Sequence, residues 1–327
     1  IDDPEAYFQV KLYSGTGSEQ SITLDGDTDM QPDLVWAKTR NDTQDYQVID
    51  AVRGATKLLA TNGTAGEFDD ANNLTAFNSD GFTVGTSGGI NGSSDTLVAW
   101  CWKESAVSGV DIISFEGTGS AHTEAHSLSA VPHMVIAKNR ERTADWLVYH
   151  AGNDVTGNYT LFLHSTSARD ASQNYWNDTA PTSSVFSVGN RLENNQSGED
   201  IIAYAFAPKQ GFSKFGIFEG NGDADGPFIY LGFRPAFVLW KNAEYAENWH
   251  LIDNKRSTFN LAKNGLTLNE NYAESDDANI QMDFLSNGIK IRSASHATSN
   301  VSGNFCVFMA FAEAPLVNSN GVPCNAR

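Results

Sequence analysis

The amino-acid sequence predicts an all-β protein made of three tandem antiparallel β-sandwich units, each a jelly roll. Three observations support this prediction: a sequence pattern that recurs about every hundred residues, short alternating or apolar segments rich in β-branched and aromatic residues, and turn-forming clusters of Asn, Asp, Gly and Ser between those segments. Short strands separated by such turns are typical of two packed antiparallel sheets. No long window keeps the 3.6-residue apolar period of a helix, and we expect at most one helical turn, around Ala51-Val-Arg-Gly54.

The repeated unit is defined by the pattern Pro-x-x-Val-x-x-Lys, which occurs at residues 32–38, 132–138 and 235–241. A Gly-x-Gly element precedes each copy, and an apolar, largely aromatic strand closes each unit. Self-similarity at a fixed period indicates tandem units. The joints, which are rich in Pro, Gly, Ser and Lys, divide the chain into three predicted units: 1–108, 109–210, and 211–327 with a short C-terminal tail. Each unit is long enough that we expect it to fold alone, unlike the short repeats of solenoids.

Composition excludes two broad classes of function. The 327 residues contain 40 acidic and 21 basic side chains, a net charge of −19, and general nucleic-acid binding requires a basic surface instead. No apolar stretch approaches the ~18 residues that span a bilayer, so we expect no membrane insertion. Because the chain begins at Ile1 and not at Met, we expect that a segment upstream is missing.

The cysteines do not predict a disulfide framework. Their number is odd, and no Cys-x-x-Cys spacing occurs. We expect Cys101 and Cys306, which lie in apolar segments, to be buried thiols, and Cys324 to lie in a loose tail.

Several stretches together resemble a domain widespread in virion proteins of marine and freshwater tailed phages. In the first unit these are Pro-Asp-Leu-Val-Trp-Ala-Lys at 32–38, Asp50-Ala-Val-Arg-Gly54, Phe77-Asn-Ser-Asp-Gly-Phe-Thr-Val84 and Val98-Ala-Trp-Cys-Trp-Lys103. The third unit is similar to the C-terminal portion of such proteins, through residues 222–230, 232–237, 253–257, 283–288 and 309–315, and residues 325–327 resemble their natural end. The middle unit departs most, with Asn153-Asp-Val-Thr-Gly157 in place of Ala51-Val-Arg-Gly54.

The resemblance implies tandem lectin-like domains, of the concanavalin A or laminin-G type, in a tail fibre or another external appendage of a virion. The implied function is structural and adhesive: receptor binding through host surface glycans, or contact with neighbouring virion subunits. Family analogy alone implies a homo-oligomer, a trimer, because no coiled-coil heptads occur. Two alternatives stay open, a polysaccharide depolymerase on a jelly-roll scaffold and a capsid-decoration or filament-forming structural protein.

We predict no catalytic residues, and therefore no enzyme. A glycosidase needs two carboxylates held ~5–10 Å apart, and no Glu-x-x-x-Glu-like strand supplies them. Glu116 and Glu219 recur before their Gly-x-Gly elements, but Ser14 takes that place in the first unit. His122 and His126 would lie ~13 Å apart along a strand, too far to bind one zinc ion.

Two candidate binding sites remain. The first is a calcium site, the one cofactor the sequence suggests, because hard oxygen ligands gather at Asp25, Asp27, Asp29 and Asp33. The second is a carbohydrate site in the middle unit, where Asn174, Tyr175 and Trp176 lie in a polar loop. We expect Trp176 to be exposed there and to stack on sugar rings. Trp146 and Trp249 recur in register between units, so we expect them in the core.

Overall fold

Antiparallel strands make up most of the structure, which confirms the predicted all-β class. The computed structural model describes residues 1–294 and 296–324, so the resemblance of residues 325–327 to a family end lies outside it. The short helices are η1 (Pro4–Ala6), α1 (Gly88–Asn91), α2 (Leu192–Asn195) and η2 (Ala278–Ile280). Residues 51–53 form a turn and not the expected helical turn. No helix in the described part of the chain has the length and apolarity needed to cross a membrane.

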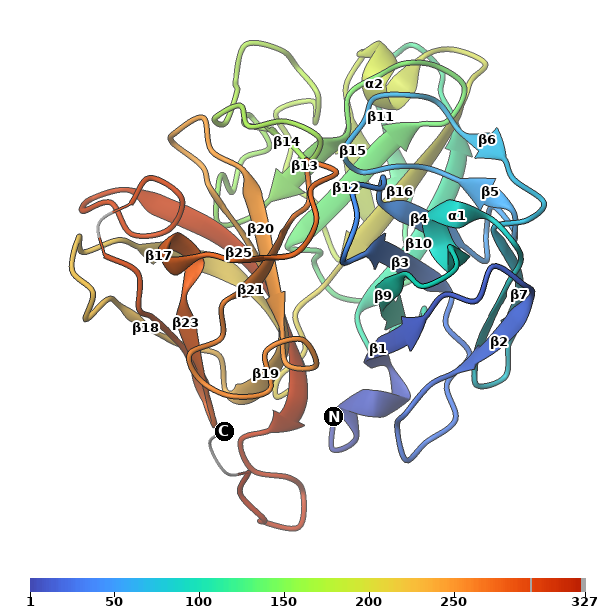
Figure 1. Cartoon of the computed structure of the whole chain (residues 1–327). Helices are drawn as coiled ribbons and strands as arrows, with labels where there is room; N and C mark the ends of the chain where they lie inside the picture. Colours follow the sequence, from blue (N-terminus) through green and yellow to red (C-terminus); the bar gives the residue numbers. More distant parts are fainter. Residues whose placement is uncertain (295, 325–327) are drawn as a thin grey trace.

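Three large sheets share one strand order over their first four strands (Figure 1). In the first sheet the order is β1 (Phe8–Ser14), β9 (Thr96–Trp102), β3 (Leu34–Thr39), β4 (Gln47–Asp50). The second sheet runs β10 (Val110–Glu116), β16 (Asp200–Phe206), β12 (Met134–Asn139), β13 (Leu147–His150), β14 (Leu161–Phe162). The third runs β17 (Ser213–Glu219), β25 (Phe305–Pro315), β19 (Phe233–Asn242), β20 (Trp249–Asp253), β21 (Asn264–Thr267), β22 (Ser275–Asp276).

A smaller sheet accompanies each large one and completes a sandwich. The smaller sheets are β2 (Gln20–Thr23) with β8 (Gly81–Val84) and β7 (Leu74–Asn78), β11 (His122–Ala125) with β15 (Val185–Val188), and β18 (Phe228–Tyr230) with β24 (Gly288–Ile291) and β23 (Met282–Leu285). The short β5 (Lys57–Leu58) and β6 (Phe68–Asp69) pair separately.

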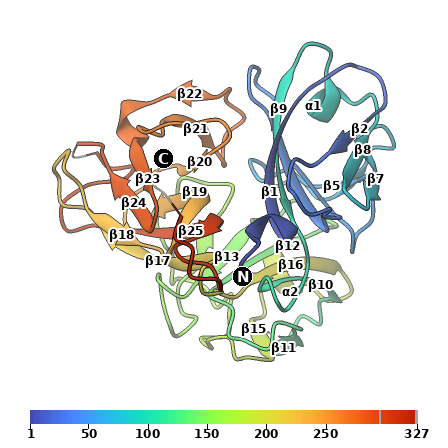
Figure 2. The same ribbon diagram turned by 90° about the horizontal axis from the view of Figure 1, so that it is seen from below.

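Both faces of each large sheet are buried, but against different partners. On β3, Val35 and Ala37 pack with the first small sheet, whereas Leu34 and Trp36 point the other way, as alternation along a strand requires. This second face joins a common core with residues from all three large sheets, including Trp100, Trp102, Trp146, Tyr204, Phe206, Phe237, Trp249 and Phe311. Figure 2 shows the three groups of strands around that shared centre.

The shared core changes the expectation that each unit folds alone. A sandwich taken by itself would expose the second apolar face of its large sheet, which only the other two sheets cover. Burial of large aromatic side chains is a main source of folding free energy. We therefore interpret the three parts as cooperating elements of one folded body.

A buried ion bridge joins the first large sheet to the second. Arg53 Nε donates to Asp50 at 2.5 Å, and both side chains are fully buried. Glu67 accepts from Arg53 Nη1 at 3.1 Å and from Arg140 Nη2 at 2.9 Å. Burial works against ionisation of Glu67, but these hydrogen bonds hold its pKa below the ordinary value. The Tyr204 hydroxyl donates to Asp50 at 2.8 Å and so adds a second link between the two sheets.

The same bridge recurs between the third sheet and the first. Arg256 Nε donates to the buried Asp253 at 2.6 Å, and Glu274 accepts from Arg256 at 3.1 Å and from Arg40 at 2.9 Å. Trp100 Nε1 donates to Asp253 at 3.1 Å. The third sheet therefore contacts the first sheet in the same way as the first contacts the second. Together with the contact between the second and third sheets, these junctions form a closed ring of three sheets.

The junction between the second and third sheets departs from this pattern. Four residues of this junction differ from their equivalents at the first junction. The places of Asp50, Arg53, Glu67 and Arg140 are taken here by His150, Asn153, Arg169 and Ala243, in that order. The backbone link is kept, with the Arg169 amide donating to the Ala243 carbonyl at 2.8 Å. His150 Nε2 donates to the Phe308 carbonyl at 3.0 Å, and burial lowers the pKa of His150 to about 4, so the imidazole is neutral. The divergent sequence of the middle unit thus coincides with a junction that has no buried Asp–Arg bridge.

The repeated lysine of the Pro-x-x-Val-x-x-Lys pattern is buried in all three copies. Lys38 donates to the carbonyls of Thr39 at 2.6 Å and Asp42 at 3.2 Å. Lys138 and Lys241 bind the corresponding carbonyls, and burial lowers the pKa of each of the three lysines to about 8. The lysine therefore holds the turn that follows its strand.

The Gly-x-Gly elements are structural turns. Gly17 has a φ of 70°, a conformation that glycine adopts without strain. The buried Asn91 side chain accepts from the Thr16 amide at 2.9 Å and donates to the carbonyls of Ser18 and Gly85. Asn195 and Asn300 hold the other two elements in the same way.

We predict that Arg53→Met lowers the free energy of unfolding by about 3–5 kcal/mol, because it leaves Asp50 buried without its cation. The control is Lys57→Met, which removes the exposed pair with Asp69 and should cost at most about 1 kcal/mol. Urea denaturation measures both, and equal losses would contradict the assigned role of the buried bridge.

Candidate functional site

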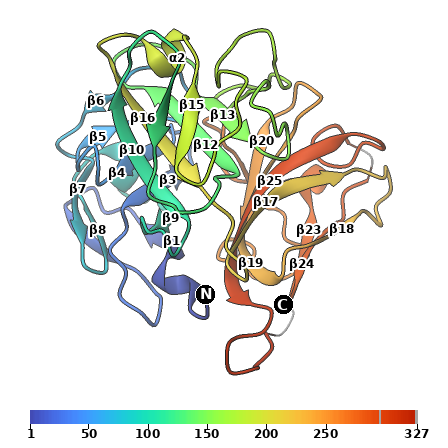
Figure 3. The same ribbon diagram turned by 180° about the vertical axis from the view of Figure 1, so that it is seen from behind.

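A pocket of about 700 Å³ lies where the second and third large sheets are connected. We call it the junction pocket. Its walls come from the start of the chain, the connection between β16 and β17, and the ends of β18 and β25. The lining residues are Ile1, Asp2, Pro208, Lys209, Gln210, Gly211, Ser213, Lys214, Tyr230, Leu231, Gly232, Pro315, Leu316 and Val317. Figure 3 shows the start of the chain and the end of β25 at the same end of the molecule.

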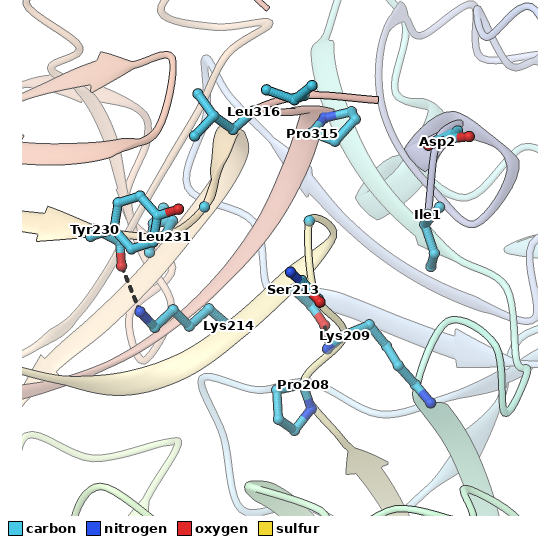
Figure 4. A pocket seen from close by; sticks show the side chains of 14 residues that line it. Ile1, Asp2, Pro208, Lys209, Ser213, Lys214, Tyr230, Leu231, Pro315 and Leu316 are labelled. Carbon is cyan, nitrogen blue, oxygen red and sulfur yellow. Dashed lines mark hydrogen bonds between the residues drawn. The ribbon is translucent and has the colours of Figure 1, made fainter. Parts of the chain in front are cut away.

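Tyr230 and Lys214 form one side of the junction pocket, opposite Ile1 and Asp2 (Figure 4). The Tyr230 side chain is half exposed, with 52% of its surface accessible. Lys214 Nζ donates to the Tyr230 carbonyl at 2.6 Å and lies 5.6 Å from the centre of its ring. The pocket therefore combines an accessible aromatic face with a cation.

Strand alternation determines how Tyr230 points. In β18, Ile229 is buried on the face that packs on the third large sheet, while Phe228 and Tyr230 are exposed on the opposite face. The chain then turns at Gly232, whose φ of 84° favours glycine. A methyl group at Gly232 would contact the Tyr230 ring at 3.5–3.7 Å, so the turn and the ring lie against each other.

A second feature is a pair of carboxyl groups, Glu104 and Asp111, between the first and second large sheets. Burial, and then a hydrogen bond with Asp111, raise the pKa of Glu104 to about 7. Glu104 Oε1 accepts from the Ile112 amide at 3.2 Å, and Asp33 accepts from the Glu104 amide at 2.8 Å. Asp111 also lines a shallow hollow of about 450 Å³ that includes His126.

Neither this carboxyl pair nor the junction pocket was predicted from the sequence. Glu104 follows β9 and Asp111 lies on β10, so strand spacing alone did not bring the two carboxyls together. The pocket residues come from four separate stretches of chain. Exposed aromatics at alternate positions of a short strand, as at Phe228 and Tyr230, were the one sequence signal available.

The predicted carbohydrate site is arranged differently from the expectation. Trp176 is 2% exposed, and its predicted exposure is wrong. Its ring packs edge-on against Tyr149 at 6.1 Å, and its Nε1 donates to Thr160 Oγ1 at 3.3 Å. Tyr175 is buried as well, while Asn174 stays exposed. The second small sheet has only two strands, and the two aromatic rings fill the sandwich interior beside it.

The predicted calcium ligands do not converge. Asp25 pairs with Lys11 at 2.5 Å, and Asp33 is engaged with the Glu104 amide. Asp27 and Asp29 complete the predicted set, but across residues 1–294 and 296–324 no three acidic, His or Cys side chains are placed to hold one ion.

The predictions for Trp146, Trp249, Cys101 and Cys306 are confirmed. Trp146 and Trp249 are buried, and their Nε1 atoms donate across sheet junctions to the carbonyls of Ala60 and Phe162 at 2.9 and 2.8 Å. Cys101 and Cys306 are buried free thiols. Cys324, which was predicted to lie in a loose tail, is instead a partly buried free thiol whose amide donates to the Leu316 carbonyl at 3.0 Å and whose Sγ donates to the Ser286 carbonyl at 3.1 Å.

We predict that the contribution of Glu104 to stability falls as the pH rises from about 4.5 to about 7, because the folded protein retains the Glu104 proton that the unfolded chain has lost. Glu104→Gln should remove this loss, a difference from the wild type of roughly 1–2 kcal/mol after allowance for solvent screening. Urea denaturation at several pH values measures it. Burial lowers the pKa values of His150 and His250 to about 4, and these histidines contribute the same pH dependence of stability to the wild type and to Glu104→Gln. Parallel pH profiles would contradict the assigned Glu104 pKa.

No curated protein matches the chain. One family model matches residues 3–315, from the turn before β1 to the last residue of β25, and it describes a domain of unknown function, DUF7483. This match covers all three large sheets, and we conclude that the chain belongs to the DUF7483 family.

Proposed function

We propose that the chain is a non-catalytic binding and scaffold module on the external surface of a virion, in a tail fibre or a similar appendage. The observation that carries the binding role is the junction pocket, where an exposed aromatic ring and a lysine lie on a buried, tightly bonded framework. A rigid framework that presents a few polar and aromatic groups in a hollow is typical of a ligand site.

The virion assignment is supported by the resemblance described from the sequence. The similar stretches at 50–54 and 253–257 contain Asp50, Arg53, Asp253 and Arg256, which build the two buried ion bridges. The resemblance therefore concerns residues that organise the framework. The partners we propose are host surface glycans and other virion subunits, including further copies of this chain in a homo-oligomer, for which the resemblance suggests a trimer.

We predict that antibodies raised against the chain label the outside of intact particles of the phage that encodes it. Immunogold electron microscopy of purified virions is the measurement, with an antibody to an internal virion protein as the negative control. Absence of the chain from purified particles would overturn the virion assignment.

The carboxyl pair favours a second candidate function, a polysaccharide depolymerase. Glu104 has a pKa of about 7, which suits a general acid, and Asp111 lines an open hollow. However, the two carboxyls are hydrogen-bonded to each other, whereas retaining glycosidases hold theirs ~5–5.5 Å apart and inverting enzymes farther. The geometry therefore favours the binding role.

Incubation of the purified chain with host capsule and lipopolysaccharide separates these two functions. We expect no released oligosaccharide from the wild type and none from Glu104→Gln, with chromatography of the soluble sugars as the measurement. Release by the wild type that is lost in Glu104→Gln would establish the depolymerase instead.

A further inference from the structure

We propose that the junction pocket binds an acidic oligosaccharide, with Tyr230 as the stacking surface and Lys214 as the partner of the ligand's carboxylate or sulfate. This inference rests on the proposed binding function and adds the class of ligand and the residues that select it.

Tyr230 supplies the stacking surface. Its side chain is 52% exposed although its neighbour Ile229 is buried, so the strand directs the ring outward. Lys214 Nζ lies over the ring, 5.6 Å from its centre. An exposed aromatic ring presents an apolar face, and the C–H face of a pyranose packs on such a surface at little cost in side-chain entropy.

Lys214 supplies the charge selectivity. Its ammonium has three N–H donors, and the Tyr230 carbonyl accepts one of them. In a chain with a net charge of −19, the residues of this pocket include two lysines and a single acidic side chain, Asp2. The Asp2 carboxylate accepts hydrogen bonds from the amide and hydroxyl of Ser319. The pocket is thus a local reversal of the overall charge, and it favours an anionic ligand.

The size of the site indicates an oligosaccharide. A volume of about 700 Å³ lies within the usual ~300–1,000 Å³ of ligand pockets. Phe228, 45% exposed, lies two residues from Tyr230 on the same face of β18 and extends the aromatic surface beyond the pocket. Lys290 pairs with Phe228 across the sheet but forms an ion pair with Asp225 at 2.8 Å, so we assign recognition of the acidic group to Lys214.

The experiment measures binding of the purified full chain to an array of acidic and neutral glycans. The array includes trigalacturonate and the galactotriose of the same linkage. The two differ only at C6 of each sugar, which is a carboxylate in the first and a neutral hydroxymethyl group in the second. We expect an acidic saccharide to bind at least ten times more tightly than its neutral counterpart. Tyr230→Ala should weaken binding of both by at least tenfold. Lys214→Gln should remove the acidic preference.

The matched controls are Tyr272→Ala and Lys263→Gln, which alter an exposed tyrosine and a surface lysine outside the pocket and should leave binding unchanged. Circular dichroism verifies that every variant is folded. The proposal would be overturned if the wild type bound no acidic saccharide, or if Lys214→Gln kept the same preference for acidic over neutral saccharides.

Failure of this proposal is distinguishable from failure of the proposed function. If the array shows no binding but antibodies to the chain still label virions and the chain adheres to host cells, the pocket assignment is wrong and the adhesive role stands. If the array shows the expected preference but virions lack the chain, the saccharide site stands and the virion assignment is wrong.

Discussion

The burial of both faces of each large sheet is the constraint on which the rest of the structure depends. One face packs on a small sheet, and the other packs on two further large sheets, so the three parts of the chain bury apolar surface on one another. Side chains at the junctions have lost their water, and the charged ones need charged partners. Asp50 with Arg53 and Asp253 with Arg256 meet that need, and Glu67 and Glu274 extend each pair across a junction.

The repeated motifs serve this framework. The repeated lysines hold turns through backbone carbonyls, and the Gly-x-Gly elements are held by buried asparagines. The junction pocket, in contrast, lies where the connection between β16 and β17 meets the ends of β18 and β25, away from the buried lysines and asparagines of the repeated motifs.

The divergence of the middle unit has a physical explanation at its junction with the third sheet. There a neutral His150 replaces the aspartate, and Asn153 replaces the arginine. Both members of the buried charge pair are absent together, which avoids an unpaired charge in the core. The same unit has a small sheet of only two strands, and Trp176 and Tyr175 fill its interior.

The sequence by itself determined the all-β class, the recurring pattern, the buried Trp146 and Trp249, and the free thiols, because alternation, turn chemistry and repetition are local properties of the chain. Only the tertiary structure decided that the large sheets share a core, that Trp176 points inward, and that Glu104 meets Asp111. It also decided that a pocket forms beside Tyr230. These features depend on how segments far apart in the sequence pack together, and the identity and spacing of neighbouring residues contain little information about that packing.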